Sequence, residues 1–446
     1  MANVQSMAPV AAIVDLMLGI VTLIMISKVN NKAQGDKIAG FLIGWILVFQ
    51  GMEYLFLSIL EFQVGSASLF GTVDTSDTER GFLLTGLYMF QISVVVLMSS
   101  LALVFPFRIL PDSWDEKAIL GSVCILSISI TTIHLVTDFD FLAIENILMV
   151  PAFVILISLY IRFLTSELRT ENDSYRKVSI ASGLILIGMF GESMTYWLSQ
   201  VLSINDEFNQ RIAIEFSIMP SGASWFGMMV GMSLGAIAIC VLFLGEIWRS
   251  YNVGAAPFSI MVFVIFIVGF IAGIADVAVL DIVTSCYDQA CQEFPSAYNI
   301  WYDFTSESLV YLYTPILFMF LLLKYDLIDT QSGNNKWLIR IIVILLLLIV
   351  SSTVLELVQS FLPIPEMISS AALAIIVAIF IGWEEKIVTQ LISGAESVSH
   401  NLPFEDGRLE NSSTVDPKVF NLTLSAILLY ILILSMLHSG LTKGGL

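Results

Sequence analysis

Long apolar stretches alternate with short polar connections along the whole chain, and each stretch has about the length of one membrane-spanning helix. A helix needs about 20 apolar residues to cross a hydrocarbon core of about 30 Å. The apolar positions are continuous, whereas the strands of a membrane β-barrel alternate. The sequence therefore predicts an all-α, polytopic bundle of transmembrane helices. The twelve predicted spans are 8–27, 38–61, 82–106, 118–137, 141–164, 179–202, 222–247, 256–281, 303–324, 337–362, 367–383 and 419–440.

The last third of the chain contains the least regular part of this pattern. Span 367–383 is short, and only a turn at Pro363 and Pro365 separates it from the span before it. These two segments could instead form a hairpin that does not cross fully. The longest polar connection, 384–418, is predicted to be a cytoplasmic linker that begins with an amphipathic helix. No sizeable soluble domain is expected, so 1–446 is one integral membrane domain.

The distribution of Lys and Arg supports twelve spans, because cytoplasmic loops of membrane proteins are rich in both. With the N-terminus outside, 16 of the 19 basic residues fall in inner connections, and only Arg80, Arg211 and Lys443 remain outside. A missing or additional span would destroy this alternation. The pattern thus predicts that both termini lie outside. The first six residues contain no Lys or Arg, so we expect the first span to be retained and not cleaved as a signal peptide.

Composition agrees with a membrane protein and adds a strong acidic bias. Hydrophobic residues make up 57% of the chain and charged residues 13%, against about 25% charged in soluble domains. The net charge is −19, and many acids lie in connections on both faces. Acidic surfaces are expected in a saline habitat, although an acidic outer face can also concentrate cations. We expect a prokaryotic cytoplasmic membrane, with the lipid bilayer and possible membrane subunits as partners and no nucleic-acid binding.

Carboxylates inside apolar spans are the most distinctive chemistry of this sequence. No Lys or Arg is expected deep in any span, and acids in such positions usually face the bundle interior and mark ion or proton paths. A lone carboxylate in a low dielectric tends to be neutral, and it can exchange a proton or bind Na⁺. The alternative role is a protonated acid that makes one interhelical hydrogen bond. The candidate binding or coupling residues are Asp15, Glu53, Glu145, Glu192, Asp276, Glu307 and Glu356.

Two of these acids lie in segments that resemble each other. Alignment of Gly44 with Gly183 also places Glu53 on Glu192, and Glu356 lies at a similar depth of a third apolar segment. This spacing predicts a three-fold repeat of a four-helix unit, with boundaries 1–140, 141–302 and 303–446. Residue identity outside the first pair is low, so the repeat rests on the pattern of spans and acids.

Metal and disulfide chemistry have weaker signals. If the repeats converge, His134, Asp276 and His438 would supply the ligand set of a transition-metal site. They come from three separate spans without local ligand spacing, so we expect no transition metal or haem. Cys286 and Cys291 share a predicted outer loop, where an oxidising environment favours a local disulfide over a metal pair.

Helix-packing signals complete the pattern. Gly227, Gly231 and Gly235 follow one another at four-residue steps, a spacing that allows two helices to approach closely. Pro151 and Pro315 lie inside predicted spans and are expected to kink them.

The leading functional interpretation is a cation- or proton-coupled transporter or permease. Glu53 and Glu192 would be its coupling acids, Asp276 and Glu356 would support them, and Na⁺ or H⁺ would be the coupling ion. The second interpretation is a non-transporting membrane module, either a sensor or a subunit of a larger complex. A membrane metalloenzyme that uses His134, Asp276 and His438 is the weakest, because these residues lack local ligand spacing and the chain has no HExxH motif. We therefore lean away from an enzyme.

Overall fold

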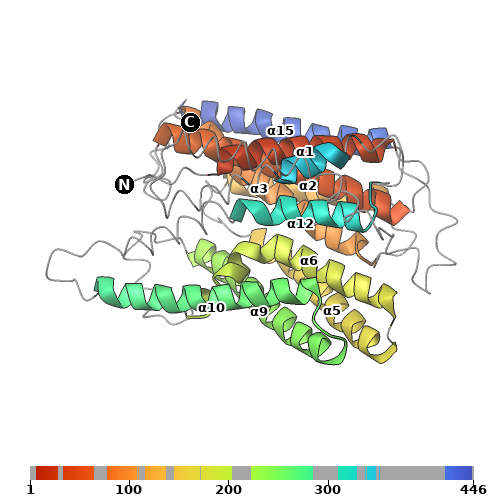
Figure 1. Ribbon diagram of the computed structural model, residues 1–446. Coiled ribbons are helices and arrows are strands. Elements are labelled where there is room, and N and C mark those ends of the chain that lie inside the picture. Colours follow the sequence, from red (N-terminus) through yellow and green to blue (C-terminus); the bar gives the residue numbers. More distant parts are fainter. Residues whose placement is uncertain are drawn as a thin grey trace. The chain divides into compact units, whose positions relative to one another are not determined.

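The computed structural model describes a set of helices and the short turns that join some of them (Figure 1). The described residues are 7–28, 34–64, 78–107, 109, 116–136, 145–170, 172–202, 222–284, 310–328, 337, 339–347, 351 and 417–443. All the regular structure in this part of the chain is helical. The main helices are α1 (Ala8–Ser27), α2 (Gln34–Val64), α3 (Thr78–Val104), α4 (Glu116–Val136), α5 (Glu145–Thr170), α6 (Asp173–Thr195), α7 (Trp197–Leu202), α9 (Gly222–Asn252), α10 (Pro257–Thr284), α12 (Val310–Lys324) and α15 (Pro417–Lys443).

Eight of the described helices are long and apolar enough to cross a membrane, and they indicate a membrane-embedded protein. Two further apolar helices, Leu120–Ile133 and Tyr313–Lys324, are shorter. The eight agree with the membrane helix bundle predicted from hydropathy. The number of spans, the location of the termini and the three-fold repeat stay predictions. Span 367–383 and nearly all of the 384–418 linker lie outside the described residues, as does most of span 337–362.

The helices fall into two compact units. Unit 1 consists mainly of Asp140–Tyr313, and unit 2 of Gln5–Ser66, Val73–Phe139 and Thr314–Leu446. In unit 1, α9 packs on α5 and α6, and α10 packs on α7 and α9. In unit 2, α2 packs between α1 and α3, and α15 lies along α3 and α4.

Glycine allows α1 and α2 to approach closely in unit 2. A Cβ atom on Gly19 would lie 2.8 Å from the carbonyl oxygen of Gly44 and 2.9 Å from the backbone nitrogen of Val48. A Cβ atom on Gly51 would lie 2.8 Å from the backbone nitrogen of Leu16. Both distances are too short for a real side chain, so the two backbones are nearly in contact over the region that contains Asp15.

Two helical hairpins form the core of unit 1. Asn172 caps α6 by accepting a hydrogen bond from the backbone N–H of Ser174 at 2.9 Å. The turn after α9 contains Gly254 with φ of +103°, a conformation that favours glycine, and α10 then begins at Pro257. These two turns bring the end of α5 to the start of α6, and the end of α9 to the start of α10.

Helix α6 is irregular within its apolar stretch. Phe190 has φ −123° and ψ 16°, and Tyr196 ends the helix with φ −115° and ψ 22°. The chain continues as α7, where Trp197 donates to the carbonyl oxygen of Phe266 at 3.0 Å and stacks on its ring. Glu192 therefore lies between two interruptions of the helix.

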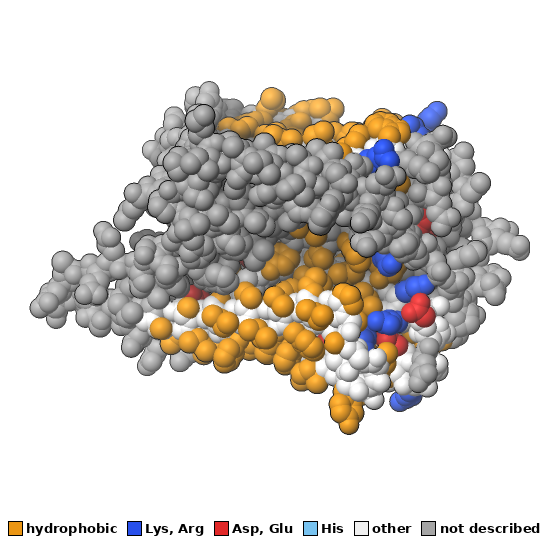
Figure 2. All heavy atoms as spheres, viewed as in Figure 1, with side chains coloured by type: hydrophobic (Ala, Val, Ile, Leu, Met, Phe, Trp, Pro, Cys, Tyr) orange, Lys and Arg blue, Asp and Glu red, His pale blue; other side chains and the backbone are white. Residues whose placement is uncertain are grey.

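Apolar side chains cover most of the described surface that Figure 2 shows. They follow α9 and α10, where exposed residues include Leu244, Ile260 and Val264. Charged side chains gather toward the end of unit 1 at which α5 passes into α6 and α9 into α10. This separation of apolar helix faces from charged helix ends is the pattern that a bilayer imposes.

Candidate functional site

Asp15 is the most unusual side chain of unit 2. It lies in the middle of α1 with no exposed surface, and neither carboxylate oxygen has a hydrogen-bond partner among the described residues. Most buried polar atoms in proteins are paired, so two orphaned oxygens on one acid require an explanation. Burial of an ionised carboxylate without partners is strongly unfavourable. This geometry therefore fits the neutral, protonated form of Asp15.

The neighbour that acts electrostatically on Asp15 is Glu53 of α2. Glu53 is half-buried, whereas Asp15 is fully buried. The close approach of α1 and α2 explains this pairing, because Gly51 of α2 lies against the turn of α1 that contains Asp15. We call Asp15 and Glu53 the acid pair. Two carboxyl groups in one apolar region do not ionise together easily.

Neutral polar groups lie beside Glu53 on α2. The side-chain amide of Gln50 donates to the Tyr54 hydroxyl at 2.5 Å and to the Thr314 hydroxyl at 3.2 Å. All three side chains are buried, and the Gln50 carbonyl oxygen has no partner among the described residues. The acid pair is thus next to a polar cluster that contains no charged group.

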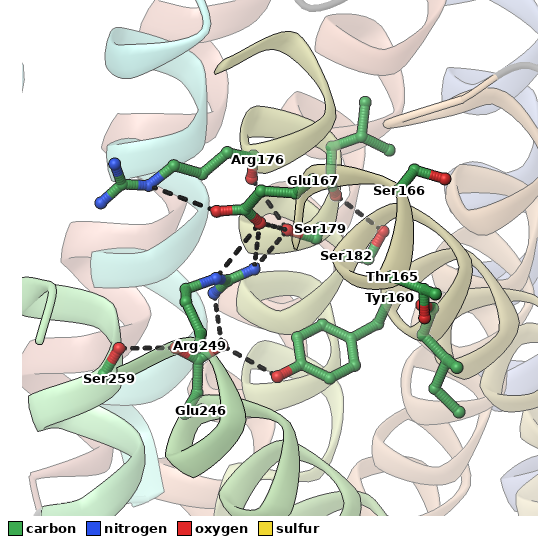
Figure 3. Close-up of polar contacts among 12 residues, drawn as sticks. Tyr160, Thr165, Ser166, Glu167, Arg176, Ser179, Ser182, Glu246, Arg249 and Ser259 are labelled. Carbon is green, nitrogen blue, oxygen red and sulfur yellow. Dashed lines mark hydrogen bonds and ion pairs between the residues drawn. The ribbon is translucent and has the colours of Figure 1, made fainter. Parts of the chain in front are cut away.

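Unit 1 contains a buried network of opposite character, centred on Arg249 (Figure 3). Arg249 has no exposed surface and pairs with Glu246 of its own helix and with Glu167 of α5. Its Nη2 atom is 3.0 Å and its Nε atom 3.2 Å from Glu167 Oε2, and Nη2 also donates to the Ser179 hydroxyl at 2.5 Å. Both acids are almost fully buried, so the guanidinium joins three helices in one place.

The remaining members of this network satisfy the two carboxylates. Glu246 accepts hydrogen bonds from Tyr160 at 2.8 Å and from Ser259 at 2.6 Å. Arg176 of α6 is about one-third exposed, and its Nε atom is 3.9 Å from Glu167 Oε1. Two arginines therefore balance two glutamates. We call the set of Tyr160, Glu167, Arg176, Ser179, Glu246, Arg249 and Ser259 the Arg249 network.

The Arg249 network corrects the predicted end of one span and the predicted location of Arg249. The sequence predicted that the span would end at residue 247 and placed Arg249 in the following connection. In the structure α9 continues to Asn252, so Arg249 occupies its last turn and points into the bundle. Glu246 and Arg249 are three residues apart, a spacing that places them on one helix face. That spacing was the available sequence signal for the site.

The predicted acids of unit 1 have polar surroundings that differ from those of Asp15. Glu192 is exposed on α6 and acts electrostatically on Tyr313, whose hydroxyl is hydrogen-bonded to Thr195. Asp276 of α10 accepts a hydrogen bond from the Ser199 hydroxyl at 2.5 Å. Asp15 is thus fully buried, whereas the Glu192 side chain is exposed on α6.

Several predicted site residues, or their side chains, lie outside the part of the chain that the structure describes. Glu145, His134 and His438 lie in α5, α4 and α15, but their side chains are outside the described part. Other candidates fall entirely outside it, namely Glu307, Glu356, Cys286 and Cys291. Their roles stay predictions. Within the described residues, no group of three His, Cys, Asp or Glu side chains has the arrangement of a metal site.

Gly231 and Gly235 of α9 allow close helix packing, as their spacing predicted. A Cβ atom on Gly231 would lie 2.9 Å from the side chain of Asn146 on α5, and one on Gly235 would overlap that of Ser193 on α6. Gly269 and Gly273 of α10 have the same role against Trp197 and Leu198. These contacts fix the position of the helices that carry the Arg249 network.

Comparison of the chain with protein-family models, curated proteins and solved structures found no match.

Proposed function

We propose that the protein is a proton-coupled membrane transporter in which the acid pair binds and releases the coupling proton. The observation that carries this proposal is Asp15, a fully buried acid whose two carboxylate oxygens have no hydrogen-bond partner among the described residues. Ionisable groups inside membrane helices are expensive to bury and usually belong to ion or proton paths.

The geometry around Asp15 favours H⁺ over Na⁺. Sites for Na⁺ in transporters commonly use backbone carbonyl groups from interrupted helices. Helix α1 is continuous from Ala8 to Ser27, so the carbonyl groups beside Asp15 are engaged within the helix. The structure provides no hydroxyl or amide ligand to the Asp15 carboxylate among the described residues. A proton needs one oxygen only, and Asp15 and Glu53 together provide two carboxyl groups that can share it.

Glu192 is a second candidate coupling residue in this proposal. It lies between two interruptions of α6, and interrupted helices are frequent around transport sites. An exposed carboxylate on a membrane helix is unfavourable against lipid, so the surroundings of Glu192 would contain water or another part of the protein. The inside–outside topology that goes with this function is the one predicted from the basic residues.

Reconstitution into proteoliposomes tests the proposal. Internal pH is followed with a trapped dye while gradients of Na⁺, K⁺ or chloride are imposed in turn. We expect gradient-driven proton movement in the wild type and its loss in Asp15→Asn and Glu53→Gln, because neither substituted side chain titrates. Glu192→Gln is expected to reduce it. Asp173→Asn is the matched control, since it removes an exposed carboxylate at the start of α6 that pairs with Lys177.

Proton movement at the wild-type rate in both Asp15→Asn and Glu53→Gln would exclude the acid pair as the coupling site. The non-transporting subunit would then be the better interpretation, and Asp15 would have only a structural role.

A further inference from the structure

One face of α5 is exposed along the helix, and its exposed side chains change from apolar to cationic toward the C-terminal end. Ile147, Val154 and Ile161 follow one another at seven-residue steps and are 40%, 53% and 47% exposed. The same face continues with Arg162 and Arg169, which are both exposed. Seven residues are close to two helical turns, so Ile147, Val154 and Ile161 form one line along the helix, and Arg162 and Arg169 form a second line about 100° around the helix from it. The exposed face is apolar first and carries the two cations afterwards.

The Arg249 network shows the depth at which this change occurs. Tyr160 of α5 bonds to Glu246 of α9, and further along both helices Glu167 bonds to Arg249. The two helices therefore run in the same direction, and the last turns of α5 lie beside those of α9. There α9 exposes Trp248 and Tyr251, with exposed fractions of 49% and 89%. Exposed Trp and Tyr side chains mark the boundary between hydrocarbon and headgroups.

Among the described residues, no acid forms an ion pair with Arg162 or Arg169. Glu167 lies between them in sequence, but it is buried on the opposite side of α5 and bonds to Arg249. Asp173 at the start of α6 pairs with Lys177 at 3.4 Å. Both guanidinium groups are thus available to an anion outside the protein.

We propose that Arg162 and Arg169 bind the headgroup phosphate of an anionic phospholipid, with its acyl chain along Ile161 and Val154. A guanidinium group presents a planar set of N–H donors that matches two phosphate oxygens. Long arginine side chains extend toward the headgroup level from different depths, so both can reach one lipid. The apolar line on the same helix face favours a lipid over free phosphate, because free phosphate has no apolar part that could contact these side chains. This inference goes beyond the transport proposal and does not depend on it.

Native mass spectrometry of the full-length protein in detergent tests this site, with phosphatidylglycerol and phosphatidylcholine of the same acyl chains as probes. We expect tighter binding of phosphatidylglycerol. Its affinity should fall about thirtyfold in the Arg162→Gln/Arg169→Gln double variant, since each basic residue near an anionic surface contributes about 1 kcal/mol. The Arg162→Lys/Arg169→Lys variant should lose less, because it keeps the charges but not the planar donors.

A matched double variant, Lys28→Gln/Lys418→Gln, removes the same charge from exposed positions of α1 and α15 in unit 2. It should bind phosphatidylglycerol as the wild type does. An equal loss in both double variants would show that overall charge, and not this site, holds the lipid, and would overturn the proposal. Equal affinity for the two lipids, or full displacement by free glycerol phosphate, would overturn it as well. A thermal unfolding measurement confirms that each variant remains folded.

Discussion

Arg249 in unit 1 and Asp15 in unit 2 are both fully buried, yet they differ in their ion pairs and hydrogen bonds. The guanidinium of Arg249 reaches two carboxylates and a hydroxyl, and each carboxylate has further donors. The carboxyl group of Asp15 has no hydrogen bond among the described residues, and its electrostatic neighbour, Glu53, is another acid. The first arrangement is stable with all its charges in place. The second disfavours an ionised carboxylate.

This difference separates a structural role from a chemical one. A charge-balanced network holds helices together. An acid without partners gains little stability from its own charge, and it is free to exchange a proton whenever water reaches it. Substitutions in the two regions should therefore have opposite consequences, with large losses of stability in unit 1 and large losses of function in unit 2.

The largest effect on stability is expected for Arg249→Met. The substitution leaves Glu167 and Glu246 buried without their common partner, and removal of one side of a buried ion pair typically costs about 3–5 kcal/mol. Unfolding in mixed micelles, followed by tryptophan fluorescence, measures the change. The control is Arg169→Met, which removes an exposed arginine of α5. Equal stability of the two variants would contradict a structural role for the Arg249 network.

A smaller loss is expected for Tyr160→Phe. The substitution removes only the hydroxyl that donates to Glu246, and a hydrogen bond to a charged group contributes about 1.5–3 kcal/mol. Tyr175→Phe is the control, because the ring of Tyr175 packs on Phe163 and its hydroxyl makes no hydrogen bond within the described residues. If both variants unfold at the same denaturant concentration as the wild type, Glu246 is adequately satisfied without Tyr160.

Gly19→Ala tests the packing around the acid pair without a change in charge. Its Cβ atom would overlap the backbone of α2 at Gly44 and Val48. Overpacking of this kind costs about 1–3 kcal/mol. Gly121→Ala on α4 is the control, since nothing lies within 4 Å of its Cβ position. A destabilised Gly121→Ala with an unaffected Gly19→Ala would show that α1 and α2 are not in close contact.

The smallest effect on stability is expected for Asp15→Asn. Replacement of a protonated acid by a neutral amide of similar size should change the unfolding free energy by no more than about 1 kcal/mol, because interhelical polar contacts in membranes contribute about that amount. The same micelle unfolding experiment measures it. A loss as large as that of Arg249→Met would mean that Asp15 is charged and has a partner.

Hydropathy predicted much of the fold because a bilayer imposes one length and one composition on every helix. Eight described helices meet this requirement, and the acids expected inside α1 and α2 are found there. The distance between Asp15 and Glu53 along the sequence gave no indication that they interact. Their interaction depends on Gly19 and Gly51, whose role becomes visible only when the two helices are packed.

The Arg249 network was missed because helix ends are the least reliable part of a prediction from hydropathy. A shift of five residues in the end of α9 moved Arg249 from an exposed connection to a buried turn. The alignment of Glu53 with Glu192 also did not predict their surroundings. Glu53 is half-buried beside Asp15, whereas Glu192 is exposed on an interrupted helix. A sequence match describes position in a span and not the neighbours that packing provides.

Measurement of the protonation state of Asp15 tests most directly whether this buried acid is protonated. Infrared difference spectroscopy makes this measurement without a known substrate. We predict that the spectrum of wild type minus Asp15→Asn contains the carbonyl band of a neutral carboxylic acid, which shifts in D₂O. The spectrum of wild type minus Glu246→Gln should instead contain the bands of an ionised carboxylate, because Glu246 belongs to the Arg249 network. An ionised carboxylate band for Asp15 would contradict the central claim that this acid is buried in its protonated form.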